Sequence, residues 1–223
     1  WKRRLDMVAK ERETGSLLDV GSGTGHFLNL ARESYEVTGT EISLKAINIA
    51  EELYGIELIH DKLADIDFGD KRFDVITIFH VLEHVPDPGA LIRRCHDLLE
   101  EGGVLIIAVP NDIRSLTVPI KRFLALLGRG RWRYYGKSGL PDIAVEGITD
   151  EIHLSHFTAP VLKKYLFDSG FYISRTGLDP FYVDTGMKRV VQAAFFGFCW
   201  GVNKITRLNL YDTIWIACFK RGG

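Results

Sequence analysis

The chain has 223 residues, of which 46% are hydrophobic and 26% charged, proportions typical of one globular domain with a substantial core. The net charge of −1 excludes a global field that would attract nucleic acid or anionic lipid. No signal peptide or unbroken apolar run of membrane-spanning length is evident.

The three cysteines, Cys95, Cys199 and Cys218, are widely spaced and lie in apolar or helical contexts. This pattern predicts buried reduced thiols rather than a disulfide or a metal site, and it fits a cytoplasmic protein. We expect one domain over residues 1–223, and the sequence gives no indication of its oligomeric state.

Short apolar runs alternate with helical patterns through the first half of the chain. The expected strands are 16–20, 36–41, 56–60, 73–79 and 104–109. The expected helices are 1–13, 24–33, 43–54 and 86–101. Because strands that alternate with helices form a parallel sheet covered on both faces, this order predicts a doubly wound, Rossmann-like α/β fold.

A glycine-rich turn follows the first expected strand. Gly21, Gly23 and Gly25 fall on alternate positions, directly before a helical pattern. Glycine allows left-handed backbone and close approach of a ligand, and a helix N-terminus offers free N–H groups to an anion. The G-x-G-x-G spacing differs from the G-x-G-x-x-G of dinucleotide-binding proteins, whose third glycine is replaced here by His26.

An acidic residue, Glu41, ends the second expected strand. In a fold of this type that position faces the ribose of a bound nucleotide. A carboxylate there accepts hydrogen bonds from two hydroxyl groups and repels a 2′-phosphate. The sequence therefore predicts a ribonucleoside ligand with an unphosphorylated ribose.

Five segments in this order and spacing resemble the class I S-adenosylmethionine (AdoMet) methyltransferases. They are 17–28, 39–43, 73–76, 82–85 and 98–103, with the sequences LLDVGSGTGHFL, GTEIS, FDVI, LEHV and LLEEGG. The stretch from His153 to Thr158 is similar to a later part of a small-molecule subgroup of that family. The resemblance implies about seven strands, mostly parallel, with the last one antiparallel.

The resemblance also implies where AdoMet would bind. The N–H groups of Thr24 and Gly25 suit its carboxylate, and carbonyl groups around Gly21 and Phe79 suit its ammonium. Asp19 either contacts the ligand or accepts hydrogen bonds from the turn. The remaining cofactor-binding residues implied by the motifs are Ser22, Gly23, Glu41, Ile42 and His80.

The resemblance places the adenine after the third expected strand, at Asp61 and Lys62. Lys62 and Leu63 occupy positions where the family commonly has a small residue. Asp65 or Asp67 is therefore an alternative to Asp61 as the acceptor for the adenine amino group.

Histidines are the natural candidates for a catalytic base, because a methyl acceptor often has to lose a proton. His80 follows the fourth expected strand, and His153 and His156 precede a later helix, so His80 or His153 is the expected base. His84 is expected to bond the backbone. No acidic or cysteine side chain stands at a metal-ligand spacing from these histidines, so we expect no metal site.

Residues 111–150 form an unusually long connection, which predicts an inserted lid over the acceptor. Its basic and aromatic residues favour an amphiphilic or anionic small acceptor, with peripheral membrane contact possible and nucleic acid not expected. A helix at 158–169, a strand at 171–176, a helix at 188–205 and a strand at 212–220 follow. The apolar run 193–200 is expected to be buried over the sheet.

The sequence thus predicts an AdoMet-dependent methyltransferase that produces S-adenosylhomocysteine and methylates a small molecule, with oxygen as the favoured atom. Two alternatives remain open at this point. One is a non-catalytic AdoMet-binding module, and the other is a nicotinamide-dependent oxidoreductase.

Overall fold

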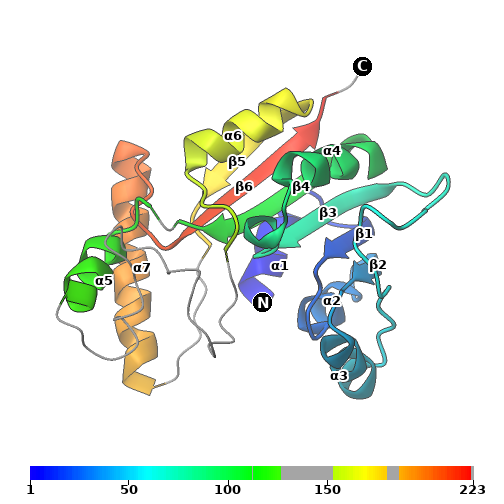
Figure 1. Cartoon of the computed structure of the whole chain (residues 1–223), viewed down its shortest axis with the longest axis horizontal. Helices are drawn as coiled ribbons and strands as arrows, with labels where there is room; N and C mark the ends of the chain where they lie inside the picture. Colours follow the sequence, from blue (N-terminus) through cyan, green and yellow to red (C-terminus); the bar gives the residue numbers. More distant parts are fainter. Residues whose placement is uncertain (112, 127–152, 180–185, 222–223) are drawn as a thin grey trace.

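A mixed β-sheet with the strand order β2-β1-β3-β4-β6-β5 forms the centre of the molecule (Figure 1). The computed structural model describes residues 1–111, 113–126, 153–179 and 186–221. Within them the six strands are β1 (Gly15–Val20), β2 (Tyr35–Thr40), β3 (Phe73–Phe79), β4 (Leu99–Pro110), β5 (Phe171–Gly177) and β6 (Thr213–Lys220). β6 runs antiparallel to the other five strands, as the resemblance implied.

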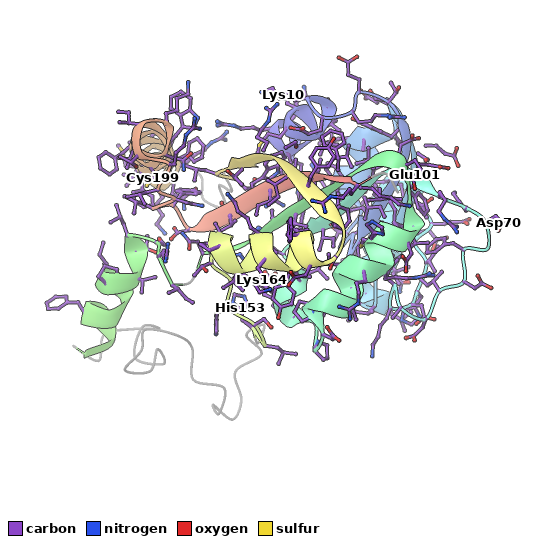
Figure 2. The ribbon with its side chains drawn as sticks, turned by 90° about the horizontal axis from the view of Figure 1, so that it is seen from above. Lys10, Asp70, Glu101, His153, Lys164 and Cys199 are labelled. Carbon is purple, nitrogen blue, oxygen red and sulfur yellow. The ribbon has the colours of Figure 1, made fainter. Side chains whose placement is uncertain are left out.

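Helices cover both faces of the sheet. They are α1 (Lys2–Ala9), α2 (His26–Ala31), α3 (Leu44–Tyr54), the 3-10 helix η1 (Leu82–His84), α4 (Pro88–Leu98), α5 (Thr117–Leu126), α6 (Ala159–Asp168) and α7 (Gly186–Thr206). Figure 2 shows α4 and α6 on one face and α1 on the other. Successive strand residues point to opposite faces of the sheet and belong to two apolar clusters. One cluster includes residues of α4 and α6, and the other includes residues of α1, α2 and α3. This alternation confirms the doubly wound arrangement.

Local sequence signals set the helix ends. The Ser43 hydroxyl accepts a hydrogen bond from Ala46 N–H, and Gly55 ends α3 in the left-handed region with φ 62°. Asp87 caps α4 in the same way through Ala90 N–H, and Pro88 occupies the first helical turn. These caps explain why both helices begin close to the predicted positions.

The strand predicted at 56–60 is reduced to a single parallel bridge between Thr40 and Ile59. Ile59 N–H donates to the Gly39 carbonyl, and Glu41 N–H donates to the Ile59 carbonyl, before the chain turns away. Ile56 and Leu58 pack into the core without a continuous ladder. The described sheet therefore has six strands rather than about seven.

The last helix of the chain, α7, corrects the expectation for residues 193–200. Only Phe196 and Cys199 of α7 are buried, in a small cluster with Leu178 and Tyr211. Figure 1 shows α7 next to α5, beyond the end of β4 and the start of β6 rather than over a face of the sheet. No described helix combines the length and hydropathy that crossing a bilayer requires.

The three cysteines are buried and free of disulfide bonds, as predicted. Burial raises the pKa of the Cys95 and Cys218 thiols, which keeps these groups protonated. They are packing residues rather than nucleophiles.

The carboxyl ends of the parallel strands bring chemically active residues to one edge of the sheet. Gly21 follows β1, Glu41 follows β2 and His80 follows β3, while Asp179 lies two residues beyond β5. The chain passes from β1 to β2 on one side of β1, and then crosses back to β3 on the other side of β1. In open α/β sheets ligands bind at such a switch point.

A prediction tests the tight packing beneath this edge. A Cβ added at Gly39 would lie 2.5 Å from side-chain atoms of Leu28, Leu58 and Ser22. We expect Gly39→Ala to lower the free energy of unfolding by about 1–3 kcal/mol in urea titrations. Gly201→Ala is the matched control, because a Cβ there meets nothing within 4 Å, and we expect it to be neutral or stabilising by about 0.5–1 kcal/mol. Equal stability of the two variants would contradict this packing argument.

Candidate active site

The turn between β1 and α2 exposes bare backbone. Gly21, Gly23 and Gly25 have φ values of 71°, 54° and 72°, which L side chains rarely adopt. A Cβ at Gly21 would lie 2.4 Å from Val81 Cγ2, and one at Gly25 would lie 2.9 Å from the Ala50 Cβ. A Cβ at Gly23 would meet nothing within 4 Å, so this residue borders open space. The turn is therefore closed behind Gly21 and Gly25 and open at Gly23.

Glu41 joins this turn to the N-terminus of α3. Its Oε2 accepts a hydrogen bond of 2.8 Å from Gly23 N–H, and its Oε1 accepts bonds of 2.8 Å from the N–H groups of Ile42 and Ser43. The carboxylate thus lies directly beside the open part of the turn. This is the arrangement that a carboxylate needs if it is to accept hydrogen bonds from a ligand seated against Gly23.

Asp19 is a buried carboxylic acid behind the turn. Its Oδ1 accepts a 2.6 Å hydrogen bond from Thr77 Oγ1, and its backbone carbonyl accepts one from Ser22 Oγ. Burial raises the pKa of Asp19 to about 7, against the opposing effects of the hydrogen bonds and of the positive charge of Arg4. The side chain therefore lends negative charge to the site only near neutral pH and above.

The other predicted cofactor residues lie at the same edge. Ser22 is buried, Thr24 and Ile42 are exposed, and Phe79 packs edge-on against Phe27. The Asp61 carboxylate accepts a hydrogen bond from Lys62 N–H. Asp61 lies two residues after Ile59, whose bridge to Thr40 brings this segment next to Glu41. The structure thus brings the predicted set together around the ends of β1, β2 and β3.

His80 belongs to a buried network that joins α1 to the residues just beyond β5. Arg4, from α1, forms a bidentate ion pair with Asp179, and both side chains are almost completely buried. The Arg4 Nη2 lies 2.8 Å from His80 Nε2. Because arginine can only donate, this contact uses the lone pair of Nε2 and leaves the Nδ1 proton facing Glu83, whose Oε1 lies 3.5 Å away.

The charged neighbours of His80 shift its pKa upward. Burial lowers the pKa of His80, but the nearby carboxylates of Asp179 and Glu83 raise it above its ordinary value, although Arg4 opposes this. Burial likewise raises the pKa of Asp179, but its bonds to His80 and Arg4 outweigh burial and hold that pKa low. The His80 backbone has φ 59°, a strained value for a non-glycine residue and one that occurs often at functional sites.

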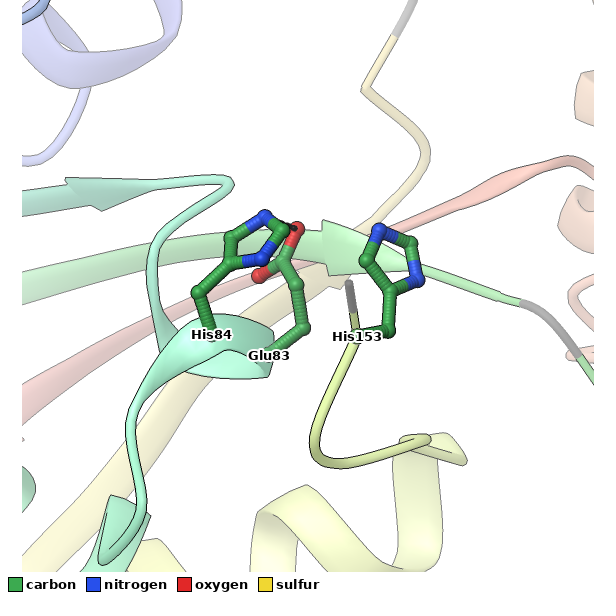
Figure 3. Close-up of side chains that lie close together, drawn as sticks. All are labelled: Glu83, His84 and His153. Carbon is green, nitrogen blue, oxygen red and sulfur yellow. Dashed lines mark ion pairs between the residues drawn. The ribbon is translucent and has the colours of Figure 1, made fainter. Parts of the chain in front are cut away.

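The second predicted base, His153, lies in a separate cluster (Figure 3). Its ring centroid is 5.0 Å from that of His84 and 6.0 Å from that of His156. Glu83 completes the group, with ligand atoms of Glu83, His84 and His153 all within 4.8 Å of one another. The expected bond of the His84 ring to the backbone stays a prediction, and the structure places that ring against His153.

Sequence reasoning missed Arg4, Glu83 and Asp179. The signal for Asp179 was an acid just after the strand at 171–177, at the edge where the other site residues lie. Arg4 gave no local signal, because its partner is 175 residues away. It also stacks on aromatic rings, with Cζ 4.6 Å from the Trp1 centroid and 4.8 Å from that of Phe79.

Most of the predicted insertion, including its basic and aromatic run at 128–137, lies outside the described residues. From the insertion the structure describes residues 111 and 113–126, which include α5.

The open glycine turn, the carboxylate beside it and the doubly wound sheet together define the site of a class I AdoMet-dependent methyltransferase. The sequence comparisons agree, because residues 1–198 match the family described as "Methyltransferase domain", and the chain belongs to this family. Membership of an AdoMet-dependent methyltransferase family decides against the oxidoreductase alternative.

Relatives with known names are methyltransferases as well. The chain is similar to ubiquinone biosynthesis O-methyltransferases of Albidiferax ferrireducens (32% identity, covering 74% of this chain and 70% of that one) and Alkalilimnicola ehrlichii (36% identity, 48% of each). The second match thus spans about half the length of that relative.

Solved structures share the fold. An AdoMet-dependent methyltransferase of Archaeoglobus fulgidus superimposes with a TM-score of 0.61 at 20% identity, covering 98% of this chain and 92% of that one. Magnesium protoporphyrin IX methyltransferase of Synechocystis, solved with bound AdoMet, gives a TM-score of 0.54 at 17% identity, covering 98% and 79%.

Burial of Asp19 predicts a specific pH dependence of stability. The unfolded carboxyl ionises near 3.8 and the folded one near 7, so between these values the folded state binds more protons. The free energy of unfolding should therefore fall as pH rises through this window, by up to about 4 kcal/mol from this group alone. We measure the free energy of unfolding in urea at pH 4.5 and at pH 7.5. We expect the difference between the two values to be smaller in Asp19→Asn than in the parent chain, by ~1 kcal/mol or more. Asp70→Asn, on an exposed loop, should leave it unaltered, and an unaltered change in Asp19→Asn would contradict the assignment.

Proposed function

We propose that this methyltransferase transfers the methyl group to an oxygen atom of a small amphiphilic molecule. The observation that carries the proposal is His80, a histidine held at the carboxyl edge of the sheet between two buried carboxylates. The similarity to ubiquinone biosynthesis O-methyltransferases supports the same reaction class.

The residues of the turn would hold the cofactor, which supplies a methyl group activated by its sulfonium charge. The N–H group of Thr24 suits the carboxylate of its amino-acid end, because α2 begins directly behind it. The Gly25 N–H, which the sequence also suggested for this role, donates instead to the Ser22 carbonyl at 3.0 Å. Glu41 would accept hydrogen bonds from the ribose hydroxyls. Asp19 adds negative charge near the ammonium and sulfonium.

His80 would act on the acceptor. A hydroxyl group that replaces Arg4 at His80 Nε2 can pass its proton to the ring as the oxygen attacks the methyl carbon. The resulting imidazolium is stabilised by Glu83 on one side and Asp179 on the other. Oxygen acceptors need this help more than aromatic amines, which are already neutral nucleophiles at neutral pH.

The exposed surface of α7 favours an amphiphilic acceptor. Apolar side chains of α7 are exposed, among them Val190, Phe198, Trp200 and Ile205, with exposed fractions from 46% to 86%. The same helix carries Lys188, Arg189 and Lys204 and no acidic residue. An apolar surface with only positive charges suits a molecule with a hydrocarbon tail, or the membrane surface in which such a molecule resides.

The experiment that tests the function measures release of S-adenosylhomocysteine from AdoMet. Phenols, catechols, benzoates, aromatic amines and thiols are compared, each with and without an alkyl tail. We expect turnover with a hydroxylated aromatic compound and a higher kcat/KM with the tail. Turnover confined to amines or thiols would contradict the proposal.

Glu41 provides the most direct test of the cofactor site. We expect Glu41→Ala to weaken S-adenosylhomocysteine binding by about 1–3 kcal/mol in calorimetry, because the ribose loses its acceptor. Glu36→Ala removes an exposed acid from β2, the strand that Glu41 follows, and should leave the affinity unchanged. If both variants bind as tightly as the parent chain, Glu41 does not hold the ribose.

His80 is tested through the rate of transfer. We expect His80→Gln to reduce kcat by roughly 10²-fold or more with an oxygen acceptor, while the Kd for S-adenosylhomocysteine stays the same. His96→Gln is the control, because His96 packs on Phe171, the first residue of β5, at the opposite end of that strand from Asp179. A kcat within twofold of the parent would exclude His80 as the base.

A further inference from the structure

Glu83 is a buried carboxylate without hydrogen bonds. Its side chain is 1% exposed, and neither oxygen accepts a hydrogen bond from any described residue. The nearest basic atoms are His80 Nδ1 at 3.5 Å and His84 Nε2 at 3.9 Å. Because an ionised carboxylate is costly to bury without a charged partner, its surroundings call for a positive charge.

Two imidazole rings lie beside this carboxylate, contributed by parts of the chain far apart in the sequence. Figure 3 shows Glu83 and His84 on η1 and His153 on the segment that leads to α6. The backbone holds the two segments together, because the N–H groups of Leu154 and Ser155 both donate to the Glu83 carbonyl, at 2.8 and 3.0 Å. The position of His153 relative to Glu83 is therefore fixed by the fold.

We propose that Glu83, His84 and His153 bind a divalent transition-metal ion such as Zn²⁺. One ligand atom from each residue lies within 4.8 Å of the others. Donors that share an ion at about 2.0–2.2 Å lie roughly 3–3.6 Å apart, and modest rotation of the half-buried rings closes the difference. Two imidazoles and one carboxylate match the ligand preference of Zn²⁺, Mn²⁺ and Fe²⁺, whereas Mg²⁺ and Ca²⁺ favour oxygen ligands alone.

The location gives the ion a role in the proposed reaction, and this part rests on that proposal. Three protein ligands leave a coordination position for an oxygen of the acceptor. A bound cation lowers the pKa of a hydroxyl group and holds it in place. His80, 3.5 Å from Glu83, would then lie beside the oxygen that loses its proton.

Metal binding is tested on the whole chain after treatment with a chelator, without reference to activity. We expect one equivalent of Zn²⁺ to bind in calorimetry, and Co²⁺ to give the visible absorption of a histidine-ligated site. His153→Gln should weaken Zn²⁺ binding more than about tenfold, and so should Glu83→Gln. His96→Gln should bind as the parent does.

Binding of S-adenosylhomocysteine, measured on the same preparations, reports whether each variant is folded. His153 lies on a partly exposed segment, so we expect His153→Gln to fold. This variant therefore tests the metal site even if Glu83→Gln does not fold. Absence of Zn²⁺ binding in the parent chain, or unchanged affinity in His153→Gln, would overturn the metal site. A chain that binds Zn²⁺ here but methylates no oxygen acceptor would contradict the proposed function and leave the metal site standing.

Discussion

The parallel alignment of β1, β2, β3 and β4 is the constraint on which the site depends. Parallel strands end at the same edge of a sheet, so residues that follow different strands become neighbours. Gly21, Glu41 and His80 meet for this reason, although up to 59 positions of sequence separate them. The hydrogen bond from Gly23 N–H to Glu41 joins two of these strand ends directly.

A buried ion pair at that edge joins two elements that are distant in the sequence. Arg4 of α1 and Asp179, two residues beyond β5, form a pair that also contacts His80. Removing one partner of such a pair leaves an uncompensated charge, so the network fixes α1 against the carboxyl end of β5. Residues from outside the central strands thus border the same edge as Gly21 and Glu41.

Local pattern was enough to predict much of the fold. Apolar runs, the Ser43 cap and the Pro88 helix start placed the strands and helices of the first half within a few residues. The glycine turn and Glu41 were also readable, because their chemistry lies in short segments. By contrast, the 56–60 segment has the composition of a strand but forms only one β-bridge within the described residues. The apolar helix α7 does not cover the sheet, and only a few of its side chains are buried, in a small separate cluster.

Contacts between residues far apart in the sequence could not be predicted from the spacing of residues along the chain. Glu83 and His153 meet only because a backbone hydrogen bond sets η1 against the segment before α6, 70 residues further along the chain. The same is true of Arg4 and Asp179. Spacing rules detect ligands and partners on one element, whereas these residues come from separate elements.

The most direct test of the account is a crystal structure with S-adenosylhomocysteine. The account predicts that the ribose hydroxyls bond to the Glu41 carboxylate and that the amino-acid end lies against residues 21–25. A nucleoside bound away from Glu41, or a glycine turn filled by side chains of the protein, would contradict it.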